Sequence, residues 1–158
     1  MNNQCTISFW IKPNGENGAR SVYFSAYNQT SWSIEKNASN KLRLYWNGNP
    51  DIHTTVSIID NEWQYITIVK NGTSDVKVYL NGELNQSLTN THNNLTFGTT
   101  WRLGRDYRSN DGTPYKGLMS DFRLYTTALS EEGIKELYSV RASGDRDSNF
   151  YSSGKFIE

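Results

Sequence analysis

The chain has 158 residues, and its 16 basic and 16 acidic side chains cancel to a formal net charge of +0. A nucleic-acid-binding protein usually carries a basic excess, so this balance argues against a nucleic-acid partner. The sequence also contains 5 Trp, 10 Tyr and 6 Phe, whereas disordered chains are poor in aromatic residues. We therefore expect one folded domain of ordinary size.

Simple counts exclude further classes of protein. The single cysteine, Cys5, cannot form an internal disulfide or a cysteine-rich zinc site. No run approaches the ~18 apolar residues of a membrane-spanning helix, so we expect no membrane insertion. The first ten residues have neither a basic region nor a long apolar stretch, and no signal peptide is visible in them.

Short runs of alternating apolar and polar residues fill most of the chain, separated by Asn, Gly, Ser and Asp. In the first run, 5–12, the residues Cys5, Ile7, Phe9 and Ile11 fall on one face. Further strands are expected, in chain order, at 21–27, 31–36, 41–46, 53–59, 63–70, 75–80, 83–87, 101–104 and 116–125. Such a series of short strands is typical of an antiparallel β-sandwich or barrel.

One segment has helical spacing. Ser130 suits the N-cap, and Glu131 and Glu132 follow at the helix end that favours anions. The spacing predicts a short helix over 131–140. The composition then shifts to Ser, Gly, Asp and Asn, so we predict a domain at 1–141 followed by a linker or assembly tail at 142–158.

The acidic residues do not form a catalytic pattern. Glycoside hydrolysis needs two carboxylates that flank the scissile bond, but the acids are scattered, as shown by Asp51, Asp60, Glu62, Asp75, Glu83, Asp106 and Asp121. Cys5 lies on the apolar face of a strand, where a thiol behaves as a small hydrophobe. Neither His53 nor His92 is near it in sequence to activate it. We therefore expect no enzymatic activity.

Calcium is the metal ion that the sequence suits best. The loop that contains Asp106, Asn110 and Asp111 offers three side-chain oxygen donors, and calcium takes six to eight oxygen ligands. The alternative is a polar turn in which Asp and Asn side chains cap the backbone. No cofactor is required by the pattern, and calcium at these three residues is the one candidate.

Aromatic residues beside planar polar groups predict sugar recognition. A pyranose stacks its apolar side on a ring, while Asn, Asp and Arg bind its hydroxyls. Trp46 shares strand parity with Leu42 and Leu44, which favours burial, so Tyr45 is expected to face the opposite side. The expected glycan contacts, at strand ends and in loops, are Tyr45, Asn47, Arg105, Tyr107 and Tyr115.

Four segments stand out in order along the chain: TISFWIKP at 6–13, WQYITIV at 63–69, VYLNGEL at 78–84, and GLMSDFRLY at 117–125 with ALSEE at 128–132. Together they resemble the laminin-G-like branch of the concanavalin A-like lectin/glucanase superfamily. The resemblance implies an all-β jelly-roll sandwich of two antiparallel sheets, with the one short helix near the C-terminus. Hydrolases of that superfamily carry a Glu-x-Asp-x-x-Glu-like strand, which this chain lacks.

The resemblance also has consequences at both ends of the domain. Family members usually open with a strand before the first of these segments, and here that strand is apparently missing. An unfilled sheet edge invites pairing with another chain. Residues 149–158 resemble segments that follow such domains in phage structural proteins.

These observations predict a non-catalytic module that recognises a surface glycan or polysaccharide. We expect it in a bacteriophage virion, as a tail or capsid fibre domain, or at an extracellular or cell surface, with weak sites combined in a homo-oligomer. One alternative is a structural, decoration or oligomerisation domain that contacts other virion or surface proteins. A further alternative, a glycoside hydrolase of the same fold, requires two carboxylates ~5–10 Å apart across a cleft.

Overall fold

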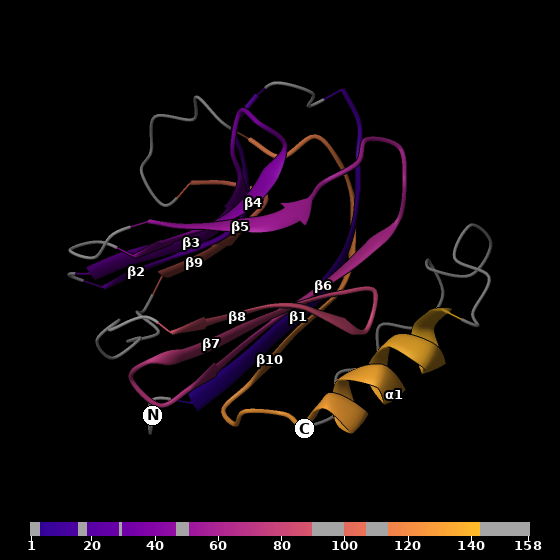
Figure 1. Ribbon diagram of the computed structural model, residues 1–158. Coiled ribbons are helices and arrows are strands. Elements are labelled where there is room, and N and C mark those ends of the chain that lie inside the picture. The colour runs from indigo at the N-terminus through magenta and orange to yellow at the C-terminus, as the bar shows by residue number, and fades with distance from the viewer. Residues whose placement is uncertain are drawn as a thin grey trace.

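Two antiparallel sheets stack on one another in the computed structural model, which describes residues 4–15, 19–28, 30–46, 51–89, 100–106 and 114–142 (Figure 1). The strands are β1 (Gln4–Pro13), β2 (Ser21–Asn28), β3 (Thr30–Lys36), β4 (Lys41–Trp46), β5 (Ile52–Ser57), β6 (Gln64–Asn71), β7 (Asp75–Leu80), β8 (Glu83–Thr89), β9 (Thr100–Leu103) and β10 (Gly117–Tyr125). The helix α1 spans Glu131–Ala142.

Sheet A has the order β10-β1-β6-β7-β8, and sheet B has the order β5-β4-β3-β2-β9. This arrangement confirms the predicted all-β sandwich of two antiparallel sheets with one short helix near the C-terminus. Each predicted strand is present with its ends shifted by no more than a few residues, and the helix continues to Ala142 rather than ending at Val140. No helix in the described part of the chain is long and apolar enough to cross a membrane.

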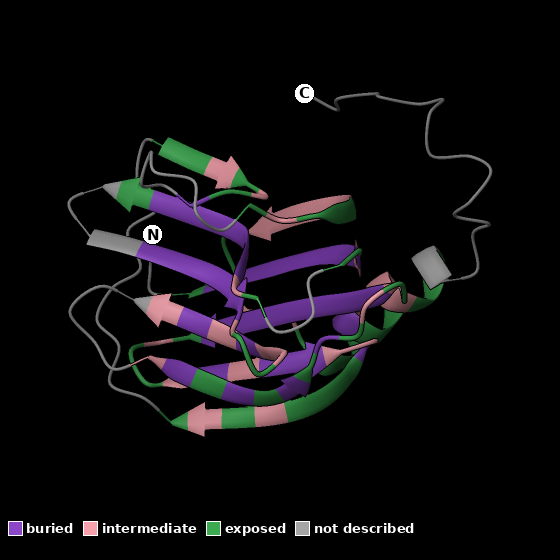
Figure 2. Cartoon of the chain, turned by 90° about the horizontal axis from the view of Figure 1, so that it is seen from above, coloured by how far each residue is buried: buried purple, intermediate pink, exposed green. Residues whose placement is uncertain are grey.

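The core fills the space between the two sheets because alternate residues of each strand point inward. On β1, Cys5, Ile7, Phe9 and Ile11 are all buried there, as their alternation predicts. Figure 2 shows buried residues concentrated in the central strands, with exposed residues on the outermost ones.

The outer face of sheet A is also buried, because α1 packs against it. Thr6, Ser8 and Trp10 belong to this face and are almost inaccessible to solvent. The ring of Trp10 lies 5.5 Å from that of Tyr138 on the helix and 4.9 Å from that of Tyr65 on β6. Apolar packing between helix and sheet therefore continues the core through this layer.

Two local devices fix the path into α1. The Thr6 hydroxyl donates a hydrogen bond to the carbonyl of Thr127 at 2.8 Å and accepts one from the amide of Leu129 at 2.9 Å. Ser130 then caps the helix, since its Oγ accepts from the amide of Gly133 at 3.2 Å. The segment between β10 and α1 is thus tied to β1 before the helix begins.

Candidate functional site

The outer face of sheet B carries polar and charged side chains on adjacent strands. Register places His53 beside Arg43, and Arg43 beside Glu35, across β5, β4 and β3. In the next row, Ser33 lies opposite Tyr45. Residues directly opposite one another in neighbouring strands project to the same side of the sheet. These side chains therefore share the face that points away from the core.

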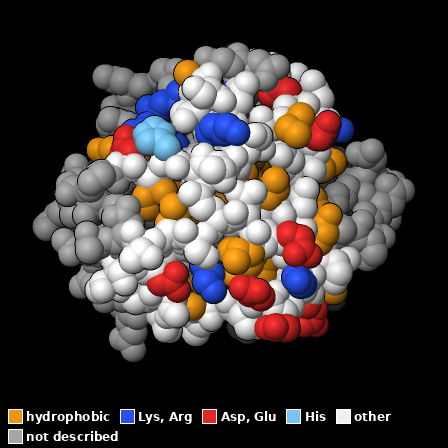
Figure 3. Space-filling view, viewed as in Figure 1, with side chains coloured by type: hydrophobic (Ala, Val, Ile, Leu, Met, Phe, Trp, Pro, Cys, Tyr) orange, Lys and Arg blue, Asp and Glu red, His pale blue; other side chains and the backbone are white. Residues whose placement is uncertain are grey.

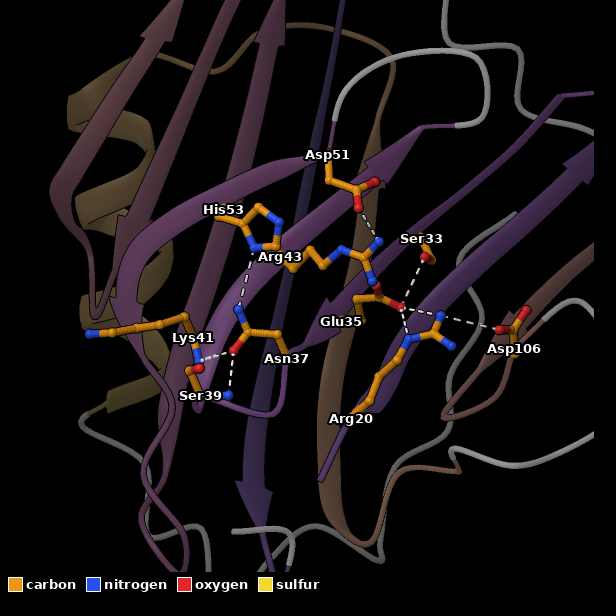
Figure 4. Close-up of polar contacts among 10 residues, drawn as sticks. All are labelled: Arg20, Ser33, Glu35, Asn37, Ser39, Lys41, Arg43, Asp51, His53 and Asp106. Atoms are coloured by element: carbon orange, nitrogen blue, oxygen red, sulfur yellow. Dashed lines mark hydrogen bonds and ion pairs between the residues drawn. The ribbon is translucent and has the colours of Figure 1, made fainter. Parts of the chain in front are cut away.

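An ion-pair network runs across this face, with Glu35 at its centre (Figure 4). Glu35 is fully buried. Its Oε2 accepts a hydrogen bond from Arg20 Nε at 2.8 Å, and its Oε1 accepts one from Arg43. Arg20 also contacts Asp106 at 3.3 Å, and Arg43 also pairs with Asp51. Each arginine thus bridges two carboxylates, and the whole series is held in one arrangement.

This network was not recognised in the sequence, although part of it had a detectable signal. Arg43 has the same strand parity as Tyr45, which was expected to face away from the core, and the short 37–40 connection places β3 and β4 as antiparallel neighbours. That pairing places Glu35 opposite Arg43. The contact between Arg20 and Asp106 cannot be inferred in this way, because the two residues are 86 positions apart.

The geometry of Glu35 bears on hydrolysis. A general acid or nucleophile must direct an oxygen at the substrate. Both oxygens of Glu35 already accept hydrogen bonds from arginines, and its side chain has no exposed surface. The arrangement is therefore better suited to holding arginines in place than to chemistry on a bound sugar.

Tyr45 lies at the edge of the network. The guanidinium carbon of Arg43 is 5.5 Å from the centroid of its half-buried ring, within the range of a cation–π interaction. Because Arg43 is itself fixed by Glu35 and Asp51, the contact orients the ring. The ring therefore lies beside guanidinium and carboxylate groups on the outer face of sheet B.

The segment after β9 brings two more predicted residues to the same face. The Ser25 hydroxyl donates to the carbonyl of Arg105 at 2.8 Å, and Arg102 donates to the carbonyl of Asp106 at 3.1 Å. Arg105 is exposed, whereas Asp106 is buried. Tyr45, Arg105 and Asp106 therefore border one surface although they come from distant parts of the sequence.

Tyr115 lies elsewhere, and its ring is half-buried rather than standing free in a polar loop. The ring packs edge-on against Tyr23 with centroids 5.2 Å apart. Its hydroxyl accepts from the amide of Lys12 at 3.1 Å and donates to the carbonyl of Leu118 at 2.6 Å. The hydroxyl thus links β1 to β10 where their ladder ends, which explains why the ring turns inward.

The remaining predicted contacts, Asn47, Tyr107, Asn110 and Asp111, lie outside the described residues. Asp106, the one calcium candidate inside them, already pairs with Arg20. Within the described ranges no group of three or more His, Cys, Asp or Glu side chains is arranged to hold a metal ion. Calcium binding stays a prediction about the loop that Asp106 begins.

Cys5 has the properties of a packing residue. It is 3% exposed in the core between the sheets. Burial raises the pKa of its thiol to about 11, an effect that exceeds the opposing influence of the nearby Lys70. The thiol is therefore protonated near neutral pH, and only a thiolate is a strong nucleophile.

Comparison with known proteins agrees with the architecture. A family model described as the concanavalin A-like lectin/glucanases superfamily matches residues 1–135. Botulinum neurotoxin type F from Clostridium botulinum is 28% identical over 146 residues, which cover 88% of this chain. The chain spans only 10% of the length of that toxin.

Two solved structures have the same fold. The heptameric SAP-like pentraxin from Limulus polyphemus aligns with a TM-score of 0.67 at 20% identity, over 91% of this chain and 72% of the pentraxin. Domain 4 of AbnA, a GH43 extracellular arabinanase from Geobacillus stearothermophilus solved with arabinotriose, aligns with a TM-score of 0.65 at 24% identity, over 86% of this chain and 66% of that domain. With the family match across 1–135, these findings show that the chain belongs to the concanavalin A-like lectin/glucanase superfamily.

Proposed function

We propose that this chain is a non-catalytic module that binds a surface glycan or polysaccharide through the outer face of sheet B. The observation that carries the proposal is the ring of Tyr45, held on Arg43 at the edge of the Asp51–Arg43–Glu35–Arg20–Asp106 network. Planar guanidinium and carboxylate groups suit paired sugar hydroxyls, and the ring suits the apolar side of a pyranose. Each group is fixed before binding, which lowers the entropic cost of association.

Figure 3 shows charged side chains, with apolar ones beside them, on this part of the surface. Basic and acidic side chains lie next to one another around the histidine, in the half of the molecule that contains sheet B. The fold neighbour from the arabinanase was solved with an oligosaccharide. At its level of identity this likeness supports the fold alone, so arabinotriose enters as a probe and not as the expected ligand.

The setting that we propose is extracellular or on a surface, including the tail or capsid fibre of a bacteriophage. A face with one aromatic platform gives a weak site, and such sites gain strength when several copies engage one polymer. Other surface or virion proteins and further copies of the chain are the partners that this setting implies.

A glycan array tests the proposal. The full chain is displayed on a multivalent carrier, and arabinotriose is included among the probes. We expect binding to a defined set of glycans, a loss of at least about tenfold in Tyr45→Ala, and near-normal binding in Tyr45→Phe, because the ring and not its hydroxyl provides the platform. Leu84→Ala, on β8 of the other sheet, is the surface control. Repeating the array with excess EDTA tests for calcium.

One observation favours a second candidate function, assembly with other proteins. Trp101 (46% exposed) and Leu103 (51%) present apolar side chains from the same face of β9, and exposed apolar side chains that lie together mark interaction sites. Sedimentation velocity on the full chain separates the two functions. An oligomer without any glycan binding would favour assembly, and a monomer that binds glycans would favour recognition.

A further inference from the structure

The ion-pair network on the outer face of sheet B joins two arginines to three carboxylates, so it carries one negative charge in excess. That charge is not presented evenly. The side chain of Glu35 has no exposed surface and that of Asp106 is 7% exposed, whereas that of Asp51 is 29% exposed. The excess charge of the network therefore meets a ligand mainly at Asp51.

Asp51 also keeps one oxygen available. Its Oδ2 accepts a hydrogen bond from Arg43, and no hydrogen bond or ion pair within the described part of the chain involves its Oδ1. Figure 4 shows Asp51 at the end of the series, with the Arg43 guanidinium between it and Glu35. A charged carboxylate can only accept hydrogen bonds, so the Asp51 Oδ1 requires a donor from a ligand or from water.

The available oxygen lies beside the ring of Tyr45. Leu44 pairs with Ile52 across β4 and β5, and one further step along this register brings Asp51 opposite Tyr45. Residues opposite one another project to the same side of a sheet. The Arg43 guanidinium connects the two side chains, since it pairs with Asp51 and its carbon lies 5.5 Å from the centroid of the Tyr45 ring. A sugar that contacts this ring therefore approaches the Asp51 carboxylate.

We propose that Asp51 determines the charge class of the glycan: the sugar unit at Tyr45 is neutral or carries an amino group, and it has no acid group. This inference deepens the proposed function and rests on it. A sugar hydroxyl or ammonium group donates to the Asp51 Oδ1. A sugar carboxylate at the same place has no proton to donate and meets a like charge.

The cations of the same face do not reverse this preference at Tyr45. Arg43 is shared between two carboxylates. Lys41 already donates to two oxygen atoms of β5, the nearer at 2.7 Å. Arg102 and Arg105 belong to β9 and the segment after it, and β9 lies three strands away from β4 in sheet B. An acid group that these arginines attract therefore lies away from the Tyr45 ring.

The test applies the full chain, on the multivalent carrier, to arrayed sugars at pH 7, where histidine is mostly neutral. Glucose, galactose and mannose are each presented as the neutral sugar, the 2-amino sugar and the uronate, beside the glycans of the array. The variants are Asp51→Asn, which removes the charge and keeps an acceptor for Arg43, and Asp51→Ala, which removes both. Asp75→Asn, on β7 of the other sheet, is the matched control for the loss of one charge.

The measured quantity is the ratio of binding between non-acidic and acidic glycans, taken over all the probes that bind. We expect a ratio of at least about tenfold in favour of the non-acidic ones. Asp51→Asn lowers that ratio, Asp51→Ala also weakens the binding of neutral sugars, and Asp75→Asn changes neither. Raising the salt concentration lowers the ratio in the wild type, because salt screens the repulsion between exposed charges. This last measurement needs no substitution.

Three results overturn the inference and leave the proposed function standing: stronger binding of acidic glycans, an unchanged ratio in Asp51→Asn, and a ratio in the wild type that does not depend on salt. The last would mean that shape and not charge excludes the acidic sugars. An array without any binding glycan is a different outcome, because it overturns the proposed function and the inference with it.

Discussion

The outer faces of the two sheets both arise from strand alternation, but they differ in composition and in what covers them. The outer face of sheet A lies under α1, and its centre is built from aromatic rings and hydroxyls, with Trp10 against Tyr138. The ion pairs Arg123–Asp121 and Lys77–Glu131 flank that centre. The outer face of sheet B is built from two arginines that bridge three carboxylates. Moving charges out of water is costly even when they are paired. An uncharged centre therefore permits α1 to cover sheet A, and a buried charged network at the centre of sheet B favours a face that remains accessible to ligands.

The largest expected effect comes from removing the central ring of the sheet A face. Trp10→Ala leaves a cavity between β1, β6 and α1, and we expect it to lower the free energy of unfolding by about 3–5 kcal/mol. Trp101→Ala, at a position that is 46% exposed, controls for the loss of a tryptophan as such and should cost far less. Urea denaturation measures both. Equal losses would mean that α1 does not bury the Trp10 face as described.

The next largest loss of stability is expected when the ion-pair network on the outer face of sheet B is broken. Glu35→Ala leaves Arg20 and Arg43 without their shared carboxylate, and we expect a loss of roughly 2–4 kcal/mol, below the full value for a buried pair because both arginines are partly exposed. Glu35→Gln keeps the shape and one acceptor and should cost less. If Glu35→Ala unfolds at the same urea concentration as the wild type, the network does not hold this face together.

These two positions also show what the sequence could and could not predict. The alternation on β1 predicted the buried row of Cys5, Ile7, Phe9 and Ile11, and Ser130 predicted the start of α1. Alternation alone does not show that the opposite face of β1 is covered, because the covering helix begins more than 100 positions later along the chain. That part of the fold depends on tertiary contacts that leave no local signal.

The candidate site could also be predicted only in part, because tertiary contacts bring its residues together. Tyr45 was assigned to the outer face of its strand by parity. Arg105 was expected among the glycan contacts at strand ends and in loops, and Asp106 was expected as a calcium ligand. The ion pairs that organise the face join β3 to residues from before β2 and after β9. The inward turn of Tyr115 depends on the gap between Lys12 and Leu118 that its hydroxyl fills.

A third prediction concerns pH and the sheet A face. Burial beneath α1, followed by the negative charge of Glu131, raises the pKa of Tyr79 to about 12. Its ordinary value is about 10, so between these pH values the folded state holds a proton that the unfolded state has lost. Stability therefore falls as pH rises from about 10 to 12, by ~2 kcal/mol from this group. Tyr79→Phe should remove that part of the decline, which urea denaturation across this range can measure. An unchanged slope in Tyr79→Phe would contradict the burial of the phenol.

The smallest expected effect concerns the hydrogen bonds that lead into α1. Thr6→Val removes the hydroxyl that joins Thr127 and Leu129 while keeping the shape of the side chain, and we expect a loss of about 1–2 kcal/mol. Exchange of the helix amides should quicken as well. The exposed neighbour Thr126, changed to Val, is the control and should alter neither quantity. Equal behaviour of the two variants would show that Thr6 does not anchor the helix.

The central claim is that the charged face, and not the helix-covered one, binds a glycan. An NMR titration of the isotope-labelled chain with the glycan that binds best on the array tests this most directly. We predict chemical-shift changes at Ser33, Arg43 and Tyr45 on sheet B, and none at Thr67 on the outer face of sheet A. Changes confined to sheet A or to the edges at β9 and β10, or an array without any binding glycan, would contradict the claim.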